Sequence, residues 1–174
     1  FTLCGQEFMA LNGGPVFQPT PALSFFVDCE SRGQMDALWE KLAEGVAVLM
    51  ERGAYPFSRR FGWLADRFGV SWQLSFSGEK QKITPYLMFT GAVHGKAEEA
   101  MQFYAGLFGD EEPPVIQYYG KEGNGPEGTV MFASFRAAGQ AFTAADSAYP
   151  HGFTSTAGSS LHVHCRDHTE IDRH

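Results

Sequence analysis

The strongest alternation of apolar and polar side chains along the chain lies in residues 70–76. This period of two predicts a strand with one buried face. The residues just before it, 66–69, predict a tight turn in which Gly69 can adopt a positive φ. Trp63 and Trp72 flank the turn. The pattern therefore indicates a β-hairpin whose two tryptophans either pack in a core or line an aromatic ligand pocket.

Other segments repeat this alternation or form short apolar runs between turn residues, and they predict further strands. In chain order these strands are Leu23–Cys29, Val46–Met50, Ile83–Phe89, Val115–Tyr119, Thr129–Phe135, Gln140–Ala144 and Leu161–Cys165. Near the start of the sequence, residues 4–7 predict the turn of a short hairpin.

Two segments instead carry the i, i+3, i+4 spacing of amphipathic helices. The first follows the N-cap candidate Ser31 and is expected to end at Gly45. The second covers His94–Phe108 and is ended by Gly109, and a last helix is expected near Asp167. Helices and strands interleave without the steady alternation of a parallel α/β fold. The order predicts the α+β class, with repeated βαβββ units.

An internal repeat supports such units. The pattern Phe-x-x-x-Gly-Gln-x-Phe-x-Ala occurs in residues 1–10 and again in residues 135–144. We predict that residues 1–77 hold the end of one module plus a complete one. Residues 83–174 are predicted to hold a complete module plus the start of the next, and residues 78–82 form a polar linker. The chain is therefore expected to be a piece of a longer tandem protein.

Composition narrows the classes of function. A net charge of −7 and the absence of a lysine- or arginine-rich cluster argue against a nucleic-acid surface. No apolar run approaches the roughly 20 residues that span a bilayer, so no membrane partner is expected. The three cysteines, Cys4, Cys29 and Cys165, form no CxxC pair, which is typical of buried thiols in a reducing compartment. We therefore expect a cytoplasmic protein.

Few side chains suggest chemistry. Alternation places His162 and His164 on one face of their predicted strand, where the two imidazoles would either bind a metal or remain solvated. Glu98 and Glu99 are adjacent on a predicted helix and point to different faces, which favours a solvated pair over acid–base catalysis.

Six longer motifs in the chain resemble the PhnB-like proteins. They are Phe-Met-Ala-Leu-Asn-Gly-Gly-Pro at 8–15, Leu-Trp-Glu-Lys-Leu at 38–42, Tyr-Pro-Phe-Ser at 55–58, Gly-Trp-Leu-Ala-Asp-Arg-Phe-Gly-Val-Ser-Trp-Gln-Leu at 62–74, Ile-Thr-Pro-Tyr-Leu-Met-Phe at 83–89 and Ala-Glu-Glu-Ala-Met-Gln-Phe-Tyr at 97–104. These proteins are often labelled 3-demethylubiquinone-9 3-methyltransferase domains and belong to the glyoxalase/bleomycin-resistance (vicinal oxygen chelate) superfamily. The resemblance implies paired βαβββ modules whose curved mixed sheets enclose a cavity, usually in a dimer. A methyltransferase activity has no sequence support, because no Gly-rich strand–loop–helix followed by an acidic residue is present.

The resemblance also implies where a metal would bind. Active enzymes of the superfamily typically hold a divalent metal with His or Gln on the first strand of a module and Glu on its last strand. The matching first strands, at 23–26 and 83–86, contain no His, and the matching last strands, at 8–12 and 70–73, contain no Glu. We therefore expect no metal site and no cofactor.

The leading hypothesis is a small-molecule-binding protein with an aromatic cavity. Its candidate ligand-binding residues are Phe26, Trp63, Trp72 and Tyr86, with Asn12 as a polar contact. The alternatives are a metal-dependent lyase, isomerase or dioxygenase of the same superfamily, and a structural repeat with a filled core. Catalysis is left open. A homodimer is expected, because residues 1–14 and 135–147 cannot both occupy the same strand position and a second chain can pair with the exposed copy.

Overall fold

Two βαβββ units form one mixed sheet in the computed structural model, which describes residues 1–45, 47–109, 112–165 and 167–172. Within these residues the first unit contains β3 (Leu23–Cys29), α1 (Arg32–Leu42), β4 (Ala47–Tyr55), β5 (Ser58–Ala65) and β6 (Ser71–Phe76). The second contains β7 (Lys82–Thr90), the 3₁₀ turn η1 (Gly91–Val93), α2 (Ala97–Phe108), β8 (Val115–Tyr118), β9 (Val130–Ala137) and β10 (Gln140–Ser147). A small hairpin of β1 (Thr2–Leu3) and β2 (Gln6–Glu7) precedes them, and α3 (His168–Ile171) follows. The predicted α+β class with βαβββ units is confirmed.

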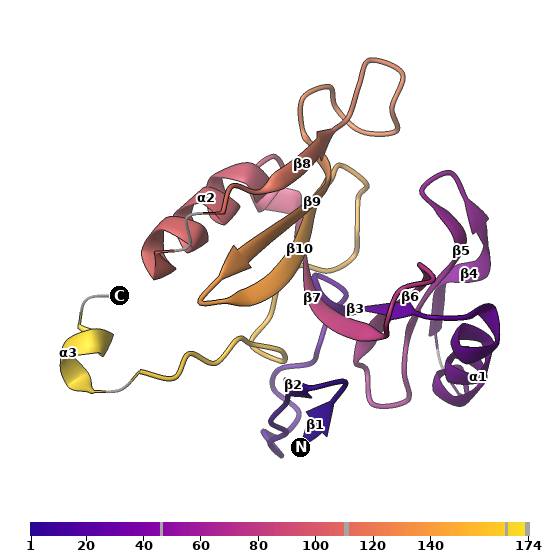
Figure 1. Ribbon diagram of the computed structural model, residues 1–174, viewed down its shortest axis with the longest axis horizontal. Helices are drawn as coiled ribbons and strands as arrows, with labels where there is room; N and C mark the ends of the chain where they lie inside the picture. The colour runs from indigo at the N-terminus through magenta and orange to yellow at the C-terminus, as the bar shows by residue number, and fades with distance from the viewer. Residues whose placement is uncertain (46, 110–111, 166, 173–174) are drawn as a thin grey trace.

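The described strands of the two units join in an open eight-stranded sheet of order β4-β5-β6-β3-β7-β10-β9-β8. The first strand of each unit lies at the centre: β3 pairs antiparallel with β7. Each also pairs parallel with the last strand of its own unit, β3 with β6 and β7 with β10. Figure 1 shows the resulting twisted sheet, with α1 and α2 beside its two halves.

The pairing of β3 with β7 places both helices on the same face of the sheet. Phe25 lies opposite Pro85, and Val27 lies opposite Ile83, so these four side chains share one face. Val27 and Ile83 pack in the cluster formed with α1. Leu87, which lies opposite Leu23 on the same face, packs against the cluster formed with α2. We call the opposite side of the sheet the helix-free face.

Helix α1 begins as its sequence predicts. The Ser31 hydroxyl accepts a hydrogen bond from the Gln34 backbone N–H at 3.1 Å, which satisfies a free donor of the first turn. The buried side chains Met35 and Trp39 attach the helix to the sheet. The helix ends at Leu42 with Ala43 as its C-cap, earlier than predicted, and the predicted stop Gly45 has a positive φ of 77°.

Helix α2 depends on a buried carboxylate from a distant strand. Asp146 of β10 is 2 % exposed, and its Oδ1 accepts hydrogen bonds from the backbone N–H groups of Gly95 and Ala97 at 2.8 and 3.2 Å. Its Oδ2 accepts a third from the Val130 N–H at 2.9 Å. The helix therefore begins at Ala97, three residues later than predicted, because residues 91–93 form the 3₁₀ turn first. Gly109 ends the helix in the left-handed conformation, as predicted.

Three other sequence predictions need correction. Residues 161–165 are not a strand; among the described residues they have no neighbouring strand, whereas their repeat equivalent in β3 pairs on both sides. The strand predicted at Val46–Met50 covers Ala47–Tyr55, and its first predicted residue lies outside the described part of the chain. Cys165 is half-buried rather than a core residue, whereas Cys29 is fully buried. Burial raises the pKa of the Cys29 thiol to about 11, so this thiol stays protonated at neutral pH.

None of the helices in the described ranges has both the length and the apolar character that crossing a bilayer requires.

The packing of α1 on β5 yields a first prediction. A Cβ atom added to Gly62 would lie 2.3 Å from Cζ3 of the buried Trp39 ring, which is far inside van der Waals contact. We expect Gly62→Ala to lower the free energy of unfolding by about 3 kcal/mol, because the indole cannot move without disturbing the cluster under α1. Urea unfolding measures the change. Gly53→Ala is the matched control, since its Cβ would meet only a Tyr55 ring carbon at 4.0 Å. Equal stabilities of the two variants would contradict the packing.

Candidate functional site

The helix-free face carries the alternate side chains of the strands in both units. The registers of β5, β6, β3, β7 and β10 align Trp63 with Gln73, Gln73 with Phe26, Phe26 with Thr84, and Tyr86 with Thr143. Strand side chains alternate between the two faces, so these residues form one continuous surface. It combines aromatic rings with hydroxyl and amide groups, a composition suited to an organic ligand.

An aromatic cluster covers part of this face. Its buried members are Phe61, Trp63, Tyr86, Met88 and Ala145, against which Phe26, Met50, Tyr55, Phe132 and Phe153 pack. Trp63 donates from Nε1 to the Ser71 hydroxyl at 2.8 Å, so its polar atom is satisfied inside the cluster. Complete burial raises the pKa of Tyr86, which keeps its phenol protonated.

Several polar side chains of the face are also paired. Gln73 donates from Nε2 to the buried Ser24 hydroxyl at 2.7 Å, and the hydroxyls of Ser58 and Ser75 lie 3.0 Å apart. Thr143 donates from its hydroxyl to the Pro85 carbonyl at 3.3 Å. Buried polar groups cost free energy unless they are bonded, and these bonds fix the rotamers around the cluster.

A hollow of about 460 Å³ opens beside the aromatic cluster. Residues of both units line it: Phe26, Asp28, Lys82, Thr84, Glu112, Pro113, Val115, Phe132, Ser134, Phe135, Arg136, Ala141, Phe142 and Thr143. Phe26 and Phe132 give it aromatic walls, with ring centroids 6.3 Å apart. The hydroxyls of Thr84 and Ser134 add groups that can form hydrogen bonds.

An ion pair lies at one side of the hollow. Lys82 Nζ is 3.5 Å from Oδ2 of Asp28, whose side chain is 14 % exposed. Burial raises the pKa of Asp28, and the nearby Lys82 ammonium opposes this rise. A partly desolvated carboxylate beside an ammonium group can bind complementary polar groups of a ligand, because both charges keep unsatisfied hydrogen-bonding capacity.

The five predicted ligand-binding residues do not lie together. Phe26 lines the hollow, and Trp63 and Tyr86 pack in the adjacent aromatic cluster on the same face. Trp72 packs against the α1 cluster on the opposite face, and its Nε1 donates to Asp66 Oδ2 at 2.9 Å. Asn12 is exposed in the segment after β2.

Sequence reasoning missed Phe132, Thr84 and Thr143 as lining residues. Each lies in a segment whose strand was predicted, and alternation within that strand assigns it to one of two faces. Alternation alone does not tell which face of each strand adjoins the hollow, because that depends on the registers between the strands.

The metal ligands expected for an enzyme of the superfamily do not fit this face. On this face, β3 and β7 carry side chains that include Ser24, Phe26, Asp28, Lys82, Thr84, Tyr86 and Met88. The only carboxylate among these is that of Asp28, which is paired with Lys82. Within the described parts of the chain, no three His, Cys, Asp or Glu side chains are grouped so that they could hold a metal ion.

The two histidines singled out from the sequence do come together. The ring centroids of His162 and His164 lie 4.4 Å apart, edge to face, although their segment is not a strand. They lie in an exposed segment, and neither lines the hollow on the helix-free face.

A second hollow of about 370 Å³ lies where β7 and β10 end. His94, Ser147 and His151 are among its lining residues. Ser147 Oγ and His151 Nε2 lie 2.8 Å apart, and burial lowers the pKa of His151. The imidazole of His151 is therefore neutral at pH 7 and serves as a hydrogen-bonding group in this loop.

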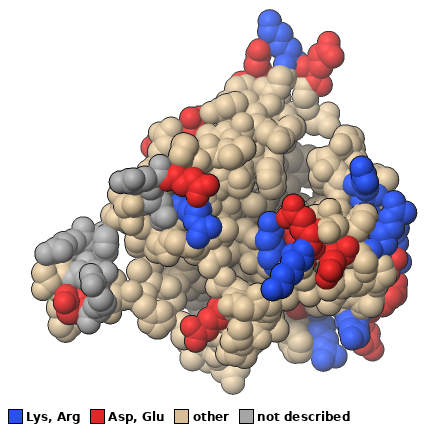
Figure 2. Space-filling view, viewed as in Figure 1, with Lys and Arg blue, Asp and Glu red and all other residues tan. Residues whose placement is uncertain are grey.

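Charges of both signs mix on the surface. In the view of Figure 2, lysine and arginine side chains lie beside aspartate and glutamate rather than in a basic strip of their own. Asp36 shows the same mixing in detail, because its Oδ1 contacts both Arg52 at 3.2 Å and Arg60 at 2.6 Å.

The sequence of the chain matches the model of a known protein family. A family described as 3-demethylubiquinone-9 3-methyltransferase has a sequence model that matches residues 1–75 and 81–174. No curated protein matches the chain.

Several solved structures are similar over part of the chain. A protein described as a putative 3-demethylubiquinone-9 3-methyltransferase, PhnB protein, from Bacillus cereus is 49 % identical over 44 % of this chain and 60 % of its own, with a TM-score of 0.43. A protein from Staphylococcus aureus is 38 % identical over 30 % of this chain and 45 % of its own, with a TM-score of 0.30. One from Pseudomonas aeruginosa is 28 % identical over 39 % of this chain and 50 % of its own, with a TM-score of 0.35. The chain thus spans between 45 % and 60 % of the length of these proteins.

The position of Trp72 leads to a prediction about stability. Its indole packs on Phe25, with ring centroids 5.2 Å apart, and donates to Asp66. We expect Trp72→Ala to lower the free energy of unfolding by about 3 kcal/mol, the lower end of the usual range for removing a large packed ring. Trp72→Phe keeps a ring but loses the hydrogen bond, and should cost about 1 kcal/mol. A cost below about 1 kcal/mol for the alanine variant, measured by chemical denaturation, is surface behaviour and would contradict this role.

A further prediction concerns metal content. We expect elemental analysis of the purified protein to find no stoichiometric Zn, Fe, Mn or Ni. His162→Ala with His164→Ala is the informative variant, because the centroids of these two imidazole rings lie 4.4 Å apart. A stoichiometric metal that this double variant loses would show that a native site was overlooked.

Proposed function

We propose that this chain, which belongs to the 3-demethylubiquinone-9 3-methyltransferase family of PhnB-like proteins in the glyoxalase/bleomycin-resistance superfamily, is a small-molecule-binding protein. Its ligand site is the hollow on the helix-free face. The observation that carries this proposal is the hollow itself, of about 460 Å³, lined by side chains from both βαβββ units.

The size and walls of the hollow suit a small organic molecule. Ligand sites typically measure about 300–1,000 Å³ and combine apolar walls with a few polar groups. Phe26 and Phe132 supply the apolar walls, and the hydroxyls of Thr84 and Ser134 supply polar groups. The ligand class that fits is a planar, largely apolar molecule with one or two groups that form hydrogen bonds.

The ion pair of Asp28 and Lys82 supports polar recognition at the edge of the hollow. A ligand cation would be attracted by Asp28, and a ligand carboxylate by Lys82, each with its opposite charge close by. The aromatic cluster next to the hollow supports a preformed site, because Trp63 and Tyr86 are already held in place by packing and, for Trp63, by a hydrogen bond.

The cysteines support the expected location. Cys4, Cys29 and Cys165 are free thiols, which suits a reducing compartment such as the cytoplasm.

Binding of a fluorescent probe tests the site. We expect 8-anilinonaphthalene-1-sulfonate, an aromatic anion of suitable size, to bind with increased emission. Ala141→Trp places an indole in the hollow, because Ala141 lines it, and should weaken probe binding about tenfold or more, equivalent to about 1.4 kcal/mol. Ala37→Trp is the control, since Ala37 is exposed on α1. Equal binding by the original chain and both variants would contradict a ligand site in this hollow.

A further inference from the structure

The hairpin at residues 1–8 is a structural copy of the β9–β10 hairpin. Thr2 pairs with Glu7 as Arg136, 134 positions later, pairs with Ala141. Both turns contain the same two left-handed residues: φ is 50° at Cys4 and 80° at Gly5, against 50° at Ala138 and 72° at Gly139. The sequence repeat is therefore also a repeat of backbone geometry.

The aromatic pair beside each turn is repeated as well. The rings of Phe1 and Phe8 are stacked, with centroids 5.7 Å apart and an interplanar angle of 16°. The rings of Phe135 and Phe142 are stacked at 5.2 Å and 22°. Two hairpins with the same register, turn and ring pair present the same surface to a partner.

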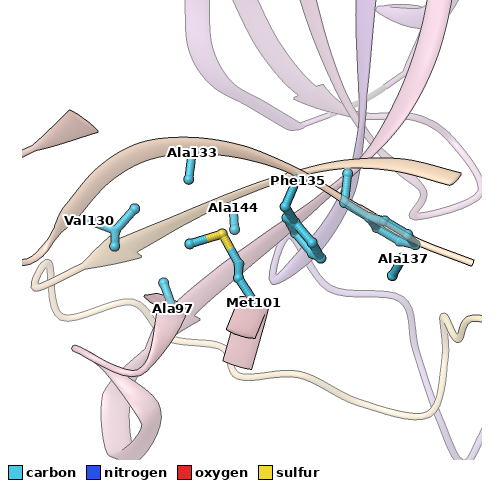
Figure 3. Close-up of a cluster of buried hydrophobic side chains, with 8 residues drawn as sticks. Ala97, Met101, Val130, Ala133, Phe135, Ala137 and Ala144 are labelled. Atoms are coloured by element: carbon cyan, nitrogen blue, oxygen red, sulfur yellow. The ribbon is translucent and has the colours of Figure 1, made fainter. Parts of the chain in front are cut away.

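In the second hairpin, this surface is covered by α2. Phe135, Phe142 and Ala144 are only 5 %, 8 % and 0 % exposed. They pack with Ala97 and Met101 of the helix in one hydrophobic cluster, and Figure 3 shows Met101 reaching toward Ala144 and Phe135. The small residues on α2 let the helix approach closely, and Met101 fills the space between it and the sheet.

The polar contact with the helix has an equivalent too. Asp146 accepts hydrogen bonds from the backbone N–H groups of Gly95 and Ala97 at the start of α2. The residue 134 positions earlier is Asn12, whose side-chain oxygen is also a preferred acceptor at helix starts. Its carbonyl dipole complements the positive end of a helix, as the carboxylate of Asp146 does.

At the first hairpin the positions equivalent to Phe135, Ala144 and Asp146 are uncovered, and the one equivalent to Phe142 is half-buried. Phe1 is 68 % exposed, and Ala10 and Asn12 are exposed. The rings of Phe8 and Phe25 pack edge to face, with centroids 5.1 Å apart. A two-stranded hairpin is marginally stable alone and gains stability by packing against a helix.

We propose that residues 1–12 form a docking surface for an amphipathic strand–helix segment of the kind that residues 82–134 form in this chain. The helix of this partner presents small residues and a methionine, as α2 presents Ala97, Met101 and Ala105. Phe1, Phe8 and Ala10 receive that face, and the Asn12 side chain accepts hydrogen bonds from the free N–H groups at its start. The partner thereby completes another βαβββ unit.

A second copy of the chain is the less favourable occupant. Its own α2 already covers its own β9–β10 hairpin. Moving that helix to the Phe1–Phe8 hairpin of another copy would expose as large an apolar surface as it buried, so no net burial would drive the exchange.

A fused chain tests the proposal. A second copy of residues 82–134 is placed directly before Phe1, so that its last residue precedes Phe1 as Ser134 precedes Phe135. The matched control carries Met101→Glu in the added copy alone. We expect amide hydrogen exchange of residues 2–8 to be about tenfold slower in the fusion than in the control, because the hairpin then opens only when the packed helix leaves.

Two variants of the fusion separate helix capping from general packing. Asn12→Ala should remove part of the protection, whereas Asn12→Asp, which restores the residue found at 146, should keep it. Equal exchange in the fusion and the Met101→Glu control would overturn the proposal. A different result would favour a second copy of the chain and overturn the proposal. In that case residues 2–8 of the original chain would already be protected from amide hydrogen exchange, this protection would rise with protein concentration, and light scattering would give the mass of a dimer.

Discussion

The antiparallel pairing of β3 with β7 is the constraint from which the other features of the molecule follow. It joins the two units along their first strands, and it brings the register partners Phe25 and Pro85 to one face and Phe26 and Thr84 to the other. Both helices therefore lie on one side of the sheet. The other side is left for the aromatic cluster and the hollow, and the hollow takes Phe26 from the first unit and Thr84 from the second. Neither unit alone contains this site.

Two aspartates, one in each unit, fix the ends of elements at different places in the fold. Asp66 accepts the backbone N–H groups of Phe68 and Val70 and the indole N–H of Trp72, which closes the turn between β5 and β6. Asp146 accepts three backbone N–H groups where α2 and β9 begin. Each carboxylate satisfies donors that would otherwise be unpaired, and hydrogen bonds to charged groups are among the stronger ones in proteins. The conformation of these junctions is therefore set by single side chains.

Local patterns predicted the elements well and their surroundings poorly. The N-cap at Ser31 and the stop at Gly109 are formed by interactions within a few residues, so the sequence contained them. The strand predicted at 161–165 was wrong because a strand needs a neighbour, and alternation of side chains cannot supply one. Trp72 and Phe26 were assigned to the same pocket although they lie on opposite faces, because the face of each strand is decided by its register with strands far away in the sequence.

The two copies of the repeat show that nearby residues set the conformation of a hairpin, whereas distant elements set the burial of its side chains. Residues 1–8 and 135–142 share their turn conformation and their stacked rings, so their common sequence specifies both. Their burial differs widely, since Phe135 is 5 % exposed and Phe1 is 68 % exposed. Burial is decided by α2, which lies far from the hairpin turn in the sequence and is held in place by Asp146. A repeated motif therefore fixes how the chain turns, whereas the elements around it decide what that turn contacts.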